Sequence, residues 1–142
     1  MEALKTKFRE GRRAEAIAEC EALCRQRPAD RALKRLCAMM HAVVQNHARA
    51  LELLLELRDP ASEDADLLFN IGVCERELNH LEDAAHFFDI YTARFPDHPE
   101  GWTSLAECRL QLKQHRDAIA LTDRAIALAP SLLQRSARPP YS

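Results

Sequence analysis

The chain has 142 residues, of which 47% are hydrophobic and 30% are charged, and its formal net charge is −2. A chain of this length can form one domain with its own core, and its balanced charge excludes an overall attraction to nucleic acid or to an anionic membrane. Glycine is scarce, with three residues, and Ala, Leu, Glu and Arg dominate, which favours helices over strands.

A helix start recurs four times along the chain. The stretches read GRRAEAIAEC from Gly11, QNHARALELL from Gln45, NHLEDAAHFF from Asn79 and KQHRDAIALT from Lys113. Each opens with a polar turn and then places an alanine before an apolar stripe. These alanines are 34 residues apart, at Ala16, Ala50, Ala84 and Ala118. A fixed step of this length predicts a repeat architecture.

Each repeat is predicted to be a pair of helices. In the third repeat, apolar residues at helical spacing form two sets, Leu67, Leu68, Ile71 and Leu78, then Leu81, Ala84, Phe87, Phe88 and Tyr91. Small residues at Ala38, Gly72 and Ala106 let the two helices approach closely, and Pro28, Pro96 and Pro130 end the second helices. One such pair has too small a core to stand alone, so neighbouring pairs must stack.

This pattern resembles the tetratricopeptide repeat, whose motif is W-x2-L-G-x2-Y, then A-x3-F, then P. The third unit reads Leu68-x2-Ile71-Gly72-x2-Glu75, then Ala84-x3-Phe88, then Pro96; the fourth reads Trp102-x2-Leu105-Ala106-x2-Arg109, then Ala118-x3-Thr122, then Pro130. His41, Glu75 and Arg109 replace the aromatic residue of the motif. The resemblance implies an all-α, right-handed solenoid of about three and a half helix-turn-helix units.

We expect a single domain over residues 1–130 and a disordered tail over 133–142. A partial unit covers 1–30, where only the second half of the motif is intact although Leu4 and Phe8 can form a short helix; full units cover 31–64, 65–98 and 99–132. No long helix is expected after Pro130. Ile119, Thr122 and Ile126 would then form an exposed apolar patch. Self-association, a longer parent protein or the folding back of Ser131–Leu133 would cover it.

In the resembled family the first helices of the units line a concave groove that holds a peptide. Residues spaced three, four and three apart share one side of a helix. This phase selects Ala32, Arg35, Met39 and Ala42, then Asp66, Phe69, Val73 and Arg76, then Glu100, Thr103, Glu107 and Leu110. None of them carries the packing signature of the repeat. We therefore expect the groove to bind a peptide with apolar anchors and a few charges.

One branch of the family grips the C-terminal carboxylate of heat-shock chaperones with Lys, Arg and Asn side chains. Asn70 matches an Asn of that cluster and Arg35 can replace a Lys, so Asn70 joins the groove candidates. Met39, Glu100 and Ser104 occupy other places of the cluster. Because Glu100 would repel a carboxylate, we expect no such clamp.

Five cysteines and six histidines raise the question of a metal site. Cys20 and Cys24 are four apart on one helix, which is half of a site, but we find no second pair at a spacing typical of zinc sites. Cys74 and Cys108 occupy equivalent repeat positions, as buried packing residues do. No phosphate loop, nucleophile elbow or H-E-x-x-H motif is present. We expect no metal, no cofactor and no enzymatic activity.

Basic residues gather near the N-terminus, where residues 1–35 hold ten basic and six acidic side chains. No aromatic platform accompanies them, so we expect no nucleic-acid partner. The odd number of cysteines, without a disulfide-scaffold spacing, indicates a reducing cytoplasm. No apolar run reaches the length of a signal peptide or a membrane span, so we expect a cytoplasmic protein without a membrane partner.

The predicted function is that of a protein-interaction module or adaptor that holds a peptide or protein segment in the groove. Three alternatives stay open. The chain can be a secretion-type chaperone, the N-terminal recruiting arm of a larger bacterial enzyme such as a glycosyltransferase, or a self-assembling structural repeat protein that forms homo-oligomers through its uncapped C-terminal end.

Overall fold

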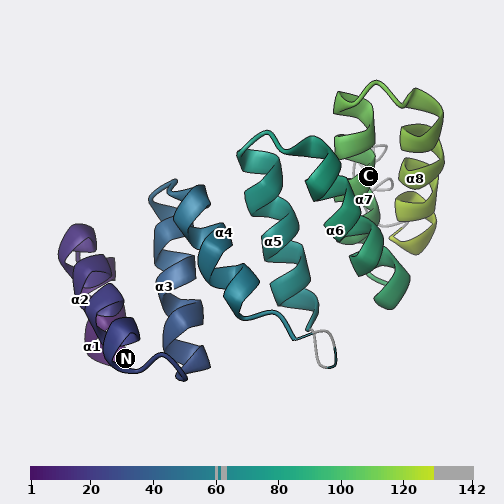
Figure 1. Cartoon of the computed structure of the whole chain (residues 1–142). Coiled ribbons are helices and arrows are strands. Elements are labelled where there is room, and N and C mark those ends of the chain that lie inside the picture. Colours follow the sequence, from purple (N-terminus) through teal and green to yellow (C-terminus); the bar gives the residue numbers. More distant parts are fainter. Residues whose placement is uncertain (60, 62–63, 130–142) are drawn as a thin grey trace, which may run out of the picture.

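The computed structural model describes residues 1–59, 61 and 64–129, and this part of the chain folds into eight helices. They are α1 (Glu2–Arg9), α2 (Arg13–Gln26), α3 (Arg31–Val43), α4 (His47–Glu56), α5 (Ala65–Glu77), α6 (Leu81–Arg94), α7 (Pro99–Gln111) and α8 (His115–Leu128). Extensive contacts join helices that are consecutive in the chain. The hairpins α1–α2, α3–α4, α5–α6 and α7–α8 follow one another in a row that starts at the N-terminus and ends at α8 (Figure 1).

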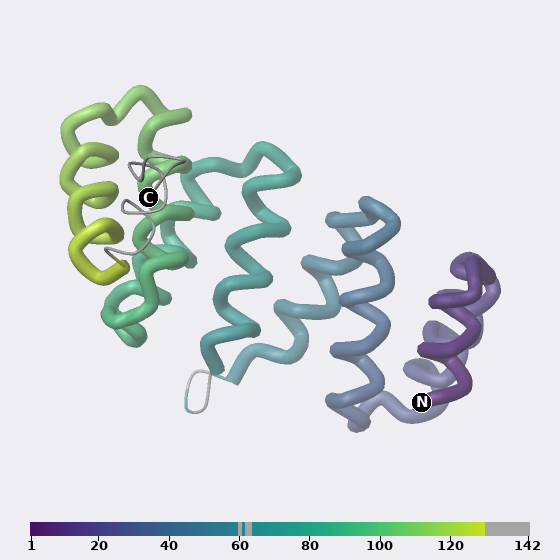
Figure 2. Tube along the Cα trace, turned by 180° about the vertical axis from the view of Figure 1, so that it is seen from behind, coloured from purple at the N-terminus to yellow at the C-terminus, as the bar shows by residue number. Residues whose placement is uncertain are grey.

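The row of hairpins keeps its order in the view from behind, so it is not an effect of projection (Figure 2). The predicted all-α solenoid of helix-turn-helix units is therefore confirmed. Its first unit begins with the eight-residue helix α1, whereas the first helices of the other units have thirteen residues. Leu4 on α1 is buried, which anchors this short helix to the solenoid.

The turn between the two helices of a unit is the same in every unit. Gly11, Gln45, Asn79 and Lys113 all have positive φ angles, of 89°, 67°, 64° and 63°, and they are 34 residues apart. In the second unit the Asn46 N–H donates to the His41 carbonyl at 2.8 Å, and the same bond recurs from His80 to Glu75 and from Gln114 to Arg109. This left-handed turn ends the first helix by satisfying its last carbonyl groups, and it explains why each repeated stretch opens on a polar residue.

Side-chain caps start three of the helices. Asp30, Asn46 and Asp64 each accept a hydrogen bond from a backbone N–H of the first turn that follows. The second helices α2 and α6 end at Gln26 and Arg94, two residues before Pro28 and Pro96. Pro130, Ser131–Leu133 and the tail predicted for 133–142 lie outside the described residues.

Small residues bring the two helices of a unit close together, as the sequence predicts. Ala16, Ala50 and Ala84 are completely buried. A Cβ atom added to Gly72 on α5 would lie only 2.7 Å from the Phe88 ring on α6. The core therefore runs along the row between the hairpins. None of the described helices is both long enough and apolar enough to cross a membrane.

Candidate functional site

The predicted groove residues lie on α3, α5 and α7, the first helices of three successive units. Met39, Asp66, Asn70, Glu100, Thr103 and Glu107 are exposed, and Arg35, Ala42, Phe69, Val73 and Arg76 are partly buried. None of the eleven is fully buried. These positions therefore form a surface of the solenoid that a ligand can reach.

Ion pairs connect the charges of this surface across neighbouring first helices. Arg35 Nη2 donates to Asp64 Oδ2 at 2.6 Å, and Arg76 Nη1 donates to Glu107 Oε2 at 2.9 Å. Asp64 also caps α5 through the Leu67 N–H at 2.7 Å. Partial burial opposes ionisation of Asp64, but the bonds from Arg35 and Leu67 lower its pKa below the ordinary value. The charges predicted to contact a peptide are thus already paired within the chain.

Phe69 does not conform to the expectation that these residues are free of packing. Its ring centroid lies 5.5 Å from that of Phe88 and 5.5 Å from that of Tyr91. Tyr91 Oη in turn lies 2.8 Å from His98 Nδ1 and 3.4 Å from Glu100 Oε1, and burial raises the pKa of Tyr91 to about 12. Phe69 and Glu100 therefore contribute to the junction between α5, α6 and α7. The helical phase alone could not show this.

Two pockets lie along the first helices and share Met39 and Val43. The larger, of about 540 Å³, lies between α1 and α3 and has an apolar floor of Phe8, Leu36, Met39, Met40 and Val43 with Lys5, Arg9 and Glu2 at its rim. The smaller, of about 200 Å³, lies between α3 and α5 and includes four predicted groove residues, Met39, Ala42, Asn70 and Val73. We call the surface lined by these residues the Met39 groove.

The part of the Met39 groove on α1 was missed from the sequence. The first unit matches only the second half of the motif, so no groove residue was assigned to its first helix. Phe8 was noted as part of a short helix, and its place one repeat before Ala42 was the available signal. Met39 and Val43 are 54% and 51% exposed. The groove thus extends further toward the N-terminus than predicted.

The end of the solenoid at α8 presents a second apolar surface. Ile119 is 63% exposed, while Ala85, at the same position one repeat earlier, is 2% exposed. α7 packs on Ala85 and Phe88, and no helix among the described residues packs on α8 in the equivalent way. Leu110, His115, Ala118, Ile119, Thr122 and Asp123 line a pocket of about 360 Å³ there. The exposure predicted for Ile119 and Thr122 is found, whereas Ile126 is partly buried.

Polar pairs stand where the motif of the family has an aromatic residue. His41 bonds to Asn46 at 3.2 Å, Glu75 bonds to His80 at 2.8 Å, and Arg109 bonds to Gln114 at 2.8 Å. In each pair the first residue lies near the end of a first helix and its partner precedes the second helix. A side-chain hydrogen bond across the turn therefore replaces the missing ring in three units.

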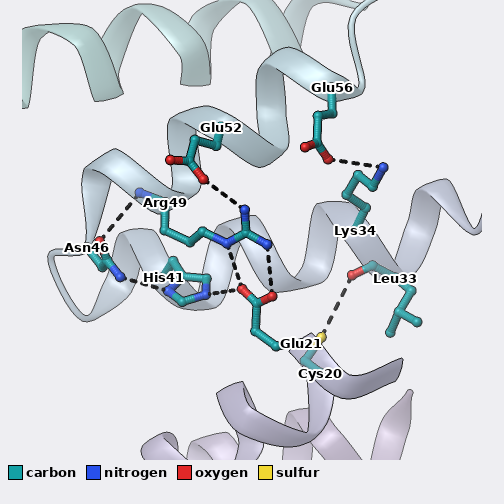
Figure 3. Close-up of polar contacts among 9 residues, drawn as sticks. All are labelled: Cys20, Glu21, Leu33, Lys34, His41, Asn46, Arg49, Glu52 and Glu56. Atoms are coloured by element: carbon teal, nitrogen blue, oxygen red, sulfur yellow. Dashed lines mark hydrogen bonds and ion pairs between the residues drawn. The ribbon is translucent and has the colours of Figure 1, made fainter. Parts of the chain in front are cut away.

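One of these positions belongs to a larger network between α2, α3 and α4 (Figure 3). Glu21 accepts bonds from both Arg49 Nε and Nη2 at 2.9 Å and from His41 Nε2 at 2.7 Å. The Arg49 guanidinium, and then His41, lower the pKa of Glu21 to about 2 against the opposing effect of burial. This charge-assisted network fastens the first unit to the second.

All five cysteines are buried free thiols, and three of them meet between α2 and α3. The Sγ atoms of Cys20, Cys24 and Cys37 all lie within 4.8 Å of one another. Cys37 is also within this distance of a carboxylate oxygen of Glu21 and a ring nitrogen of His41. Cys37 and His41, four apart on α3, are the second pair that the sequence analysis did not find. The signal was the equal spacing of the two pairs.

Comparisons with known proteins agree with this architecture. A family model described as tetratricopeptide repeat matches residues 75–132. The solved structure of MamA AMB-1 aligns with a TM-score of 0.82 at 17% identity, covering 90% of this chain and 76% of that chain. A tetratricopeptide repeat protein from Parabacteroides merdae ATCC 43184 aligns with a TM-score of 0.81 at 18% identity, covering 91% of this chain and 52% of that chain. No curated protein sequence gives a match.

At these identities the solved structures show the fold alone. The family match, the fold and the left-handed turns at a constant step of 34 residues nevertheless point the same way. Solenoids of this kind form extended concave binding surfaces from successive units. The chain is a tetratricopeptide repeat protein, by its match over residues 75–132 and by the fold of the described residues.

Proposed function

We propose that the chain is a protein-interaction module that binds a polypeptide segment in the Met39 groove. One observation carries this proposal: Met39 and Val43, more than half exposed, join two apolar pockets into one surface. Contiguous exposed apolar surface on a folded protein is typical of a binding site. The function is binding and not catalysis.

The groove favours a ligand with apolar anchors over a ligand selected by charge. Arg35 and Arg76 are already paired with Asp64 and Glu107, so using them would require breaking internal bonds. At the α1 end, Lys5 and Arg9 stand beside an apolar floor that contains Phe8. A segment with two or three apolar side chains, and an acidic residue at the end that lies on α1, fits this surface.

The test is a selection from a displayed library of random peptides, followed by fluorescence anisotropy with the selected sequences. We expect peptides with spaced apolar residues, whose affinity falls at least about tenfold in Met39→Glu, because one buried apolar side chain contributes about 1.5–3 kcal/mol. Leu55→Glu is the matched control, since Leu55 is 41% exposed on α4 and lies outside the groove.

Equal binding by wild type and Met39→Glu would refute the groove as the binding site, as would selected peptides without apolar anchors. Circular dichroism spectra of both variants establish that they fold. Phe69 and Arg76 are poorer choices for substitution, because Phe69 packs against Phe88 and Tyr91 and Arg76 pairs with Glu107.

Self-association through the end face of α8 is a second candidate function. The exposed Ile119, at a position that is buried one repeat earlier, favours it. Sedimentation of wild type over a range of concentrations should show a dimer that Ile119→Glu dissociates and Leu55→Glu does not. A monomeric wild type would remove this candidate without affecting the groove.

Two finer roles remain predictions. A secretion-type chaperone and a recruiting arm of a larger enzyme, such as a glycosyltransferase, would both use the groove. The sequence of the segment selected by the groove would distinguish them, because a chaperone binds a cargo protein and an arm binds the substrate of its enzyme.

A further inference from the structure

The junction between α2 and α3 differs from the later junctions in what fills it. Counted by repeats, Cys20 occupies the position of Leu54 and Phe88, and Cys37 that of Ile71 and Leu105. The later junctions thus pack large apolar side chains where the first junction has thiols. Cys74 and Cys108, the other two cysteines, are not part of this cluster.

The three thiols of this junction converge from two helices. Cys20 and Cys24, one turn apart on α2, face Cys37 on α3, and all three Sγ atoms lie within 4.8 Å of one another. Zinc–sulfur bonds of about 2.3 Å place thiolates about 3.8 Å apart around a tetrahedral ion. The thiols therefore need to move by only about 1 Å to share one ion.

The surroundings of the cluster suit a bound ion. Cys20 Sγ contacts the Leu33 carbonyl at 3.8 Å, which fixes its direction, and Cys24 lies at the edge with 9% exposure, which provides an entry path. A carboxylate oxygen of Glu21 and a ring nitrogen of His41 lie beside Cys37. The fourth position of a tetrahedral ion would face this polar side.

We propose that Cys20, Cys24 and Cys37 form a three-thiolate site for a thiophilic metal ion of the Zn²⁺ class, which clips the short first unit to the rest of the solenoid. Soft thiolate ligands select such ions over hard cations. Hydrogen bonding to Cys20 and burial raise the pKa of the Cys37 thiol. The ion must therefore displace the thiol protons, which leave to solvent as the metal–sulfur bonds form.

The experiment titrates the reduced full chain with Co²⁺, followed by competition with Zn²⁺. We expect a sulfur-to-cobalt charge-transfer band that saturates at one equivalent and disappears when Zn²⁺ is added. Cys24→Ser and Cys37→Ser should each weaken Zn²⁺ binding at least tenfold. Cys74→Ser is the matched control, because Cys74 is an equally buried thiol outside the cluster, and it should bind as wild type does.

A measurement on the wild type keeps the proposal testable if a cluster variant fails to fold. In moderate urea, with and without Zn²⁺, alkylation mapped by mass spectrometry should show protection of Cys20, Cys24 and Cys37 but not of Cys74 or Cys108. No charge-transfer band, uniform protection of all five thiols, or equal Zn²⁺ affinity in all variants would overturn the proposal. A disulfide between two cluster cysteines after mild oxidation, without metal binding, would also overturn it.

Discussion

Gly72 and Phe88 form a size-matched pair, and replacing Gly72 by Ala tests how closely two helices of a hairpin pack. A Cβ atom at position 72 would lie 2.7–3.0 Å from three ring atoms of Phe88, whereas carbon atoms in contact sit about 3.5–4.0 Å apart. One repeat earlier, Ala38 and Leu54 occupy the same two positions. A methyl group is thus accepted where the opposite side chain is leucine.

Two effects of opposite sign determine the free energy of unfolding of Gly72→Ala. Alanine favours a helix over glycine by about 1 kcal/mol, and forcing an extra group into a filled core costs about 1–3 kcal/mol. Phe88 is completely buried, so its ring has no free space to enter. We expect a net loss of about 1 kcal/mol with Phe at position 88, and a gain of about 1 kcal/mol in a Phe88→Leu background.

Urea unfolding of the wild type, the two single variants and the double variant measures this coupling, which we expect to be about 2 kcal/mol. The slopes of the transitions should agree among the four chains, so that differences in midpoint report stability. If Gly72→Ala stabilises the chain equally with Phe or Leu at position 88, the close approach of the helices does not limit packing, and the reasoning is refuted.

Further predictions concern the turns and the Glu21 network. Gln45→Gly and Lys113→Gly should each raise the free energy of unfolding by about 1 kcal/mol, because a left-handed backbone penalises a side chain; Gly11→Ala should lower it, and urea unfolding measures all three. The Arg49 guanidinium lowers the pKa of Glu21 to about 2, so the pair stabilises the fold above the ordinary pKa near 4.5, and about 2–3 kcal/mol is lost as the pH falls toward 2. In Glu21→Gln, unfolding measured across this window should depend less on pH; an unchanged slope would show that other carboxylates dominate.

The hairpins could be predicted from the sequence because each turn needs a residue that tolerates a left-handed backbone at a fixed step. Gly11, Gln45, Asn79 and Lys113 all meet that need at the same place in the unit. A period set by local backbone geometry is visible in one dimension. The fold class followed from it, and so did the small residue Gly72 between two helices.

The site was harder to predict, because its properties depend on how neighbouring helices are rotated against each other. Helical phase placed Phe69 on an open face, but the tilt of α6 brings Phe88 and Tyr91 against its ring. The approach of Cys37 to Cys20 likewise depends on the junction of two helices from different units. Side chains from separate helices converge only in three dimensions.

The order of contacts along the row has a consequence for how the chain acquires its structure. Since extensive contacts join consecutive helices, folding closes short loops, and chains with such low contact order fold within microseconds to milliseconds. No pairing between distant segments has to be found first. For the same reason, a 34-residue unit inserted between Phe95 and Pro96 would lengthen the row and leave both ends intact. Length is therefore the property of this fold that evolution can change most easily.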